Sequence, residues 1–189
     1  MGVGTLKSPM DMWNYQEILV ALQPSMIVEF GTWCGGSALF FASVMRQIGK
    51  PFVVYSVDIS HARVSDKAKS DPNLRLVTKS SASEEVRDEI AALRRDYRGP
   101  MFAILDSDHS KDHVLAEMKN MRDVMVAGDY MVVEDSNLNG HPVDRSFGPG
   151  PYEAIEEYFR LFPNDYEHDL ERERRFGFTF ATNGFLRRK

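Results

Sequence analysis

The fold is decided by residues 26–37, MIVEFGTWCGGS, where an apolar run meets a turn that is rich in glycine. Residues 26–30 form a short run that is largely apolar or β-branched, as is typical of a buried strand, and residues 36–48 then carry apolar positions at helical spacing. Glycines at such a strand-to-helix turn let backbone amides approach a ligand, because no Cβ atom stands in the way.

The same alternation continues along the chain. Four further runs read as strands, at 52–58, 74–78, 101–106 and 129–134, and helical stripes occupy 82–97 and 110–121 between them. Strands that alternate with helices predict an α/β fold, a doubly wound and mostly parallel sheet with helices on both faces. In such sheets, ligands bind outside the carboxyl ends of the strands.

The flanking segments add to this core. Residues 11–22 predict an amphipathic helix with Asp11 as its N-cap, and a helix at 152–162 and a β segment around 176–187 complete the chain. Residues 136–151 are rich in Gly, Pro and Asn and predict a long loop, of the kind that often serves as a substrate-side lid.

Composition narrows the function classes. With 189 residues, 43% of them hydrophobic, the chain predicts a single soluble domain, 1–189. A net charge of −5 argues against nucleic acid as the main partner. Cys34 is the single cysteine, and no run of residues predicts a signal peptide or a membrane span, so we expect a cytoplasmic protein with no membrane partner.

The glycine turn and the next strand predict a nucleotide site. Asp58 ends the strand that follows, where a carboxylate can accept both hydroxyls of a ribose. The G-x-x-x-G-G spacing from Gly31 differs from that of dinucleotide binders, and Glu29 suits a cationic ligand such as S-adenosylmethionine (SAM). The alternative is that Gly35 and Gly36 only permit close packing and that Asp58 caps a turn.

Two other strand ends carry acidic residues. Asp106 follows the fourth predicted strand, and Glu134 and Asp135 end the fifth, so the three carboxylates would converge and repel one another without a cation. Oxygen ligands favour Mg²⁺, with Mn²⁺ or Ca²⁺ as alternatives. Neighbouring strand residues face opposite sides, so Glu134 and Asp135 can share an ion only where the strand has ended. Alternatively, Asp106 caps a helix and the other two form a solvated loop pair.

A histidine lies beside this cluster. His109 stands three residues after Asp106, where an imidazole could accept the proton of a substrate. Lys111, two residues later, is the competing base. Asp108 either caps the helix or orients His109, and we expect His113 to be structural.

Several segments together resemble a known family. They are KSPMDMWNYQEIL, VEFGTWCGGSALFFAS, VDIS, ILDSDHSKDHVLAEM, GDYMVVEDSNLNGHPV and GPGPYEAIEEYF. They resemble the family named for cephalosporin hydroxylase, whose studied members are SAM- and Mg²⁺-dependent O-methyltransferases of antibiotic biosynthesis, including enzymes that methylate macrolide sugars.

The resemblance implies a class I SAM-methyltransferase fold, with His109 as the general base. It implies three metal ligands: Asp106, Glu134 and Asp135. With the reading of the glycine turn, it gives these expected SAM contacts: Glu29, Gly31, Thr32, Gly35, Ser37, Asp58, Ser81 and Asp106.

Substrate and assembly do not carry over with the family. Family members usually have a further N-terminal region, before the block that begins at Lys7, which helps to form the substrate pocket and oligomer contacts. We therefore expect only a small-molecule hydroxyl acceptor, such as a sugar, and a possible homo-oligomer. Two rivals are a non-catalytic SAM- or nucleotide-binding module and an iron-dependent hydroxylase, which usually needs two histidines and one carboxylate.

Overall fold

A computed structural model of the protein describes all residues from 1 to 189. Its elements, in chain order, are α1 (Pro9–Leu22), β1 (Met26–Phe30), α2 (Gly36–Ile48), β2 (Val53–Asp58), α3 (Asp66–Lys69), β3 (Leu74–Thr78), α4 (Glu84–Asp96), β4 (Met101–Leu105), α5 (Lys111–Arg122), β5 (Tyr130–Val133), α6 (Pro151–Leu161), β6 (Tyr166–His168), α7 (Leu170–Arg174) and β7 (Phe185–Arg188).

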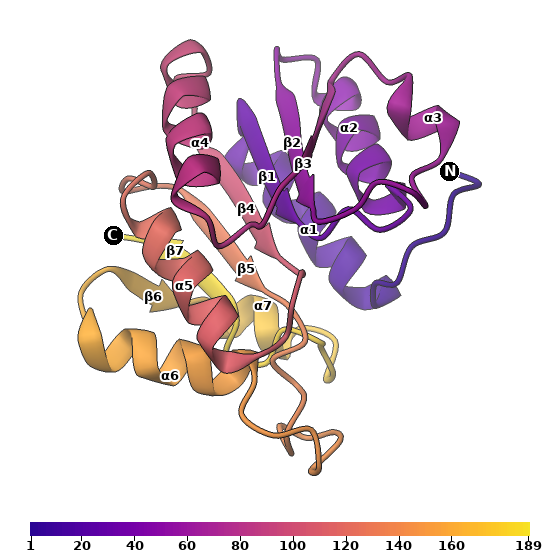
Figure 1. Ribbon diagram of the computed structural model, residues 1–189. Helices are drawn as coiled ribbons and strands as arrows, with labels where there is room; N and C mark the ends of the chain where they lie inside the picture. Colours follow the sequence, from indigo (N-terminus) through magenta and orange to yellow (C-terminus); the bar gives the residue numbers. More distant parts are fainter.

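The seven strands form one sheet in the order β3-β2-β1-β4-β5-β7-β6 (Figure 1). The first five are parallel, whereas β7 runs antiparallel to both β5 and β6. The predicted α/β fold with a mostly parallel sheet is therefore confirmed. Successive strands are added on one side of β1 up to β3 and on its other side from β4 onward, which places the switch point of the sheet between β1 and β4, beside the glycine turn.

Helices cover both faces of the sheet (Figure 1). Successive residues of β1 alternate between them: Met26, Val28 and Phe30 pack toward α4, α5 and α6, whereas Ile27 packs toward α1 and α2. This alternation is the period-2 geometry of a strand, and burial on both faces explains why β1 is apolar almost throughout.

The predicted N-cap of α1 is wrong. The helix begins two residues earlier, because Pro9 occupies its first turn and Ser8 Oγ accepts a hydrogen bond from the amide of Asp11. The Asp11 carboxylate is buried and instead accepts hydrogen bonds from Thr179 Oγ1 at 2.7 Å and from Phe180 N at 2.8 Å. It therefore joins α1 to the end of the chain.

The end of the chain also differs from the prediction. The expected β segment at 176–187 contracts to β7, and residues 176–184 are irregular. Sequence patterning missed α3, β6 and α7, because four, three and five residues are too few to reveal a period. The predicted loop at 136–151 contains only turns until α6 begins at Pro151, as expected.

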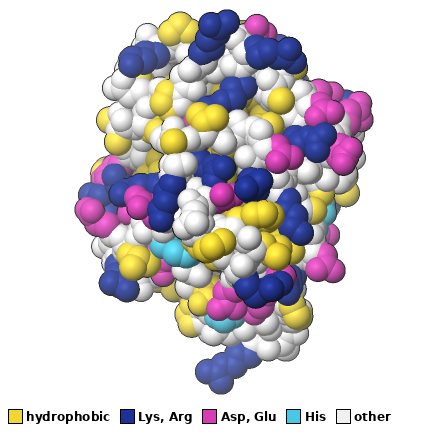
Figure 2. Space-filling view, turned by 90° about the vertical axis from the view of Figure 1, so that its left-hand side faces the viewer, with side chains coloured by type: hydrophobic (Ala, Val, Ile, Leu, Met, Phe, Trp, Pro, Cys, Tyr) yellow, Lys and Arg dark blue, Asp and Glu magenta, His cyan; other side chains and the backbone are white.

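Basic and acidic side chains are interspersed over the face that Figure 2 displays. None of the helices combines the length and the apolar character that crossing a membrane would require.

Candidate active site

A cavity of about 480 Å³ opens at the carboxyl ends of the parallel strands. Its walls come from the turns after β1, β2, β3, β4 and β5, and the segment 4–7 closes another side. This is the place where an open α/β sheet binds its ligand.

Gly31 lines the cavity, but its own position is dictated by the neighbouring backbone. Its φ of +93° is in the left-handed region, and a Cβ atom there would lie 1.8 Å from the carbonyl oxygen of Asp106. Gly36 is equally confined, because a Cβ atom would lie 2.0 Å from Thr5 Oγ1. Close packing therefore explains why residue 36 is a glycine. It also explains the glycine at position 31, whether or not a ligand binds beside it.

Asp58 lines the cavity and also holds the glycine turn. Its Oδ2 accepts hydrogen bonds from Thr32 N at 3.0 Å and Trp33 N at 2.9 Å, and its Oδ1 accepts one from Ser60 N at 3.1 Å. Asp58 therefore does cap a turn, as the alternative interpretation of the sequence proposes. These contacts fix the carboxylate at the cavity wall.

The remaining predicted SAM contacts lie at different depths. Thr32, Ser37 and Ser81 line the cavity, whereas Gly35 and Glu29 do not. Glu29 is fully buried behind the wall, where its Oε2 accepts a hydrogen bond from Ser56 Oγ at 2.6 Å, and burial raises its pKa. Gly35 instead faces α3, since a Cβ atom there would lie 2.7 Å from Ala68 Cβ.

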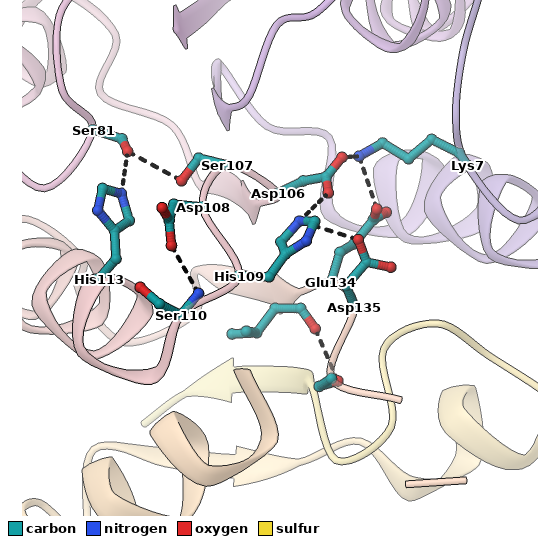
Figure 3. A network of polar contacts seen from close by, with 12 residues as sticks. Lys7, Ser81, Asp106, Ser107, Asp108, His109, Ser110, His113, Glu134 and Asp135 are labelled. Atoms are coloured by element: carbon teal, nitrogen blue, oxygen red, sulfur yellow. Dashed lines mark hydrogen bonds and ion pairs between the residues drawn. The ribbon is translucent and has the colours of Figure 1, made fainter. Parts of the chain in front are cut away.

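The three predicted metal ligands come together as the topology requires (Figure 3). β4 ends at Leu105 and β5 at Val133, so all three acids stand just beyond their strands. Asp135 has a φ of +53°, which ends the strand geometry and lets it face the same region as Glu134. Glu134 is only 2% exposed, which excludes the alternative of a solvated loop pair.

Lys7 is the residue that sequence reasoning missed. Its ammonium, on a side chain that is 2% exposed, pairs with Asp106 Oδ2 and with Glu134 Oε2, the latter at 2.9 Å (Figure 3). Burial disfavours the charged form, but the charges of both acids outweigh it and raise the pKa of Lys7. The segment that carries Lys7 was recognised as a motif, but partners 99 and 127 residues away left no signal in the sequence.

The other oxygen of Glu134 is also occupied. Tyr15 Oη donates a hydrogen bond of 2.6 Å to Glu134 Oε1. Burial raises the pKa of Glu134, whereas for Asp106 the charge of Lys7 and the hydrogen bond of His109 outweigh burial and lower the pKa. Asp106 is therefore the more firmly ionised of the two.

His109 lies between two of the acids. Its Nε2 is 3.4 Å from Asp106 Oδ1 and 3.1 Å from Asp135 Oδ2. Burial opposes a charged imidazole, but the hydrogen bond to Asp106 and the charge of Asp135 outweigh it and raise the pKa of His109. Lys111, the competing base, is the first residue of α5 and does not line the cavity.

Three other polar residues make contacts of their own outside the acidic cluster. Asp108 Oδ1 accepts a hydrogen bond from Ser110 N at 2.8 Å, so it caps the start of α5. His141, in the long loop, stacks on Tyr152 with ring centroids 3.6 Å apart and does not line the cavity. His61 Nε2 lies 3.3 Å from Thr32 Oγ1.

The donor set fits a divalent cation. Asp106, His109 and Asp135 each bring one ligand atom to within 4.8 Å of the others. Glu134 borders this group but directs its oxygens to Lys7 and Tyr15. Carboxylate oxygens with at most one imidazole suit a hard ion, and the second histidine of an iron hydroxylase site is not in this group.

Comparison with known proteins identifies the family of this chain. The family model described as Rhamnosyl O-methyltransferase/CmcI matches residues 1–189. The chain belongs to this family. The predicted resemblance is confirmed, since CmcI is the family named for cephalosporin hydroxylase, and the chain is an O-methyltransferase.

Two curated members of the Rhamnosyl O-methyltransferase/CmcI family illustrate the similarity. A rhamnosyl O-methyltransferase of Mycobacterium tuberculosis (strain ATCC 25618 / H37Rv) is 59% identical over 186 residues, which are 98% of this chain and 76% of that protein. One from Mycobacterium leprae (strain TN) is 60% identical over 189 residues, 100% of this chain and 82% of that protein.

A solved structure of CmcI with Mg and SAM shares the fold. Its TM-score is 0.77 at 23% identity, and the match covers 98% of this chain and 73% of that one. The similarity supports the doubly wound architecture of the Rhamnosyl O-methyltransferase/CmcI family, and the ligands of that structure agree with the cofactors predicted from the sequence.

Proposed function

We propose that the protein transfers the methyl group of SAM to a hydroxyl group of rhamnose or a similar sugar on a small molecule, with the help of a divalent cation. The observation that carries this proposal is the convergence of Asp106, Asp135 and His109 at one end of a cavity whose walls include Gly31 and Asp58. The sugar follows from the names of the curated relatives at 59% and 60% identity.

SAM would lie along the glycine turn. Asp58 presents a carboxylate that backbone amides already hold in place, which suits the paired hydroxyls of a ribose. Thr32, Ser37 and Ser81 supply further polar groups on the wall. Glu29 is too deeply buried for direct contact with SAM.

Asp106, Glu134 and Asp135 would hold the cation, Glu134 through the Oε2 that now pairs with Lys7, so that the ion would take the place of the ammonium at that oxygen. Mg²⁺ is the first choice and Mn²⁺ an alternative. A divalent ion bound there would lower the pKa of a hydroxyl group that it coordinates. The chain's own contribution is to gather the carboxylates at two strand ends and to keep Glu134 aligned through Tyr15.

His109 would accept the proton of the substrate hydroxyl. Its Nε2 faces the carboxylates of Asp106 and Asp135, which stabilise the imidazolium that forms. Such a base helps because an alkyl hydroxyl is almost wholly protonated at neutral pH and is then a poor nucleophile. Lys111 lies outside the cavity lining, which favours the histidine.

The activity test uses SAM, a rhamnoside acceptor and purified protein. Methylated product should form with Mg²⁺, disappear when EDTA is added and return with excess Mg²⁺. Asp106→Asn should bind Mg²⁺ more weakly by calorimetry and stay inactive at metal concentrations that saturate the wild type. Undiminished turnover in EDTA would remove the cation from the proposal.

The base is tested by His109→Ala beside Lys111→Ala as the matched control. We expect His109→Ala to lower kcat by roughly 10²–10⁴-fold, the usual contribution of general-base catalysis, with little change in SAM affinity. Lys111→Ala should keep the wild-type kcat. The reverse pattern would transfer the role to Lys111.

The remaining expectations belong to the same proposal. The chain would act as one domain in the cytoplasm, with the loop 136–151 on the substrate side of the cavity. A homo-oligomer is the assembly we would look for first, since oligomer contacts are usual in the family that the sequence resembles. Light scattering on the purified chain measures it directly.

A further inference from the structure

A second polar cluster, to which Ser81, Ser107 and His113 belong, lines another part of the same cavity (Figure 3). Behind these residues, Glu117 is 0% exposed. The mechanism proposed above gives Glu117 no task. A carboxylate without solvent contact must be compensated by its neighbours, so its hydrogen bonds show what it holds in place.

Three groups converge on one oxygen of this carboxylate. Ser107 Oγ donates to Glu117 Oε1 at 2.5 Å, Ser81 Oγ donates to the same atom, and His113 Nε2 lies 3.2 Å away. His113 Nε2 is also 3.0 Å from Ser81 Oγ, and the two serine oxygens are 3.2 Å apart. Every hydroxyl hydrogen therefore has its partner within the cluster.

The direction of these hydrogen bonds fixes the polarity of the wall. An ionised carboxylate only accepts, and each serine hydroxyl has a single hydrogen. Because Glu117 takes both hydrogens, Ser81 and Ser107 can present only lone pairs to the cavity. A ligand atom that meets this wall must then be a donor.

We infer that Glu117, acting through Ser81 and Ser107, makes this wall selective for the exocyclic amine of adenine over a 6-oxo purine. The inference rests on the proposed function, which puts SAM in the cavity with its ribose at Asp58. The base then occupies the remaining part of the cavity, where its N6 amine donates to the serine oxygens. A 6-oxo group would set its own lone pairs against theirs.

The test compares S-adenosylhomocysteine with S-inosylhomocysteine, which differ at this edge of the purine. Calorimetry gives both dissociation constants, and their ratio is the readout. A buried acceptor that faces another acceptor costs a factor of roughly 10–100 in affinity, so the wild type should prefer the adenine compound by that factor. An equal affinity of the wild type for both compounds overturns the inference.

Glu117→Gln is the decisive variant, because a carboxamide can donate to one serine and free that hydroxyl to turn toward the cavity. The preference for S-adenosylhomocysteine over S-inosylhomocysteine should fall about tenfold, because the freed hydroxyl can donate one hydrogen bond to the 6-oxo group. A merely structural role for Glu117 would weaken both compounds equally and leave the ratio unchanged, which overturns the inference.

Two further variants protect the test. Ser81→Ala removes one of the two oxygens and should also lower the ratio, so it decides the matter if Glu117→Gln does not fold.

Asp129→Asn is the matched control. Asp129 is also a buried acid, but it lies before β5, where it accepts a hydrogen bond from Met101 N at 2.8 Å. The affinity ratio of this variant should equal that of the wild type.

The two hypotheses fail in different ways. If the wild type binds neither compound, the proposed function fails and the inference is overturned with it. If the wild type binds S-adenosylhomocysteine but the ratio is unaffected by Glu117→Gln and by Ser81→Ala, the inference alone is overturned.

Discussion

The buried ammonium of Lys7 makes a sharp prediction about stability. Lys7→Met keeps much of the side-chain volume but leaves Asp106 and Glu134 facing each other without a fixed cation. Both Lys7 and Glu134 are 2% exposed, so water cannot replace the lost charge. Removing one partner of such a pair costs roughly 3–5 kcal/mol of the free energy of unfolding.

For a chain of this length, that cost lowers the melting temperature by roughly 6–20 °C. Circular dichroism in EDTA measures it without any need for substrate. Added Mg²⁺ should then narrow the gap between the variant and the wild type, because an ion among the acids supplies the missing positive charge.

Lys79→Met is the matched control. Lys79 also pairs with two acids, Glu85 and Glu89, but these pairs lie on the surface. The Lys79→Met protein should therefore melt at the wild-type temperature. A Lys7→Met protein that melts in EDTA at the wild-type temperature would refute the reasoning. So would a gap that Mg²⁺ leaves unchanged.

Three further predictions follow from the site. Asp58→Ala should weaken SAM binding by roughly 1.5–3 kcal/mol, because the ribose loses a charged hydrogen-bond acceptor. Wild-type affinity for SAM in a calorimetric titration would show that SAM binds elsewhere. Gly31→Ala should lower the melting temperature even without ligand, because its Cβ atom would collide with Asp106; an unchanged melting curve contradicts this. Tyr15→Phe should weaken Mg²⁺ binding, measured by calorimetry, because Glu134 loses the hydrogen bond from Tyr15. An unchanged affinity for Mg²⁺ would show that this hydrogen bond does not align Glu134.

The sequence predicts the architecture because burial on both faces leaves a local signature. The strands β1 and β4 are apolar runs that end at turn residues, and their bounds agree with the prediction to within one residue. The same logic places Asp106, Glu134 and Asp135 together, since the carboxyl ends of neighbouring parallel strands share an edge.

The sequence could not predict contacts between residues that are far apart along the chain. Lys7 and Tyr15 come from the N-terminal segment, and nothing in their local pattern indicates that both bind Glu134. Glu117 reads as an ordinary polar residue of an amphipathic helix until the structure shows two serines and a histidine around it. Asp11 was misplaced because an acidic residue near a helix start suits a cap and a buried anchor equally well.

The close approach of Gly31 to the backbone of Asp106 has an evolutionary consequence. Because a carbonyl group rather than a ligand excludes a side chain there, selection for folding alone preserves the glycine. A duplicated copy that lost its activity would keep Gly31 while Asp106 and His109 drifted to other residues. Under the proposed function, the acid and the histidine would therefore distinguish working enzymes from inactive descendants among homologues, whereas the glycine would not.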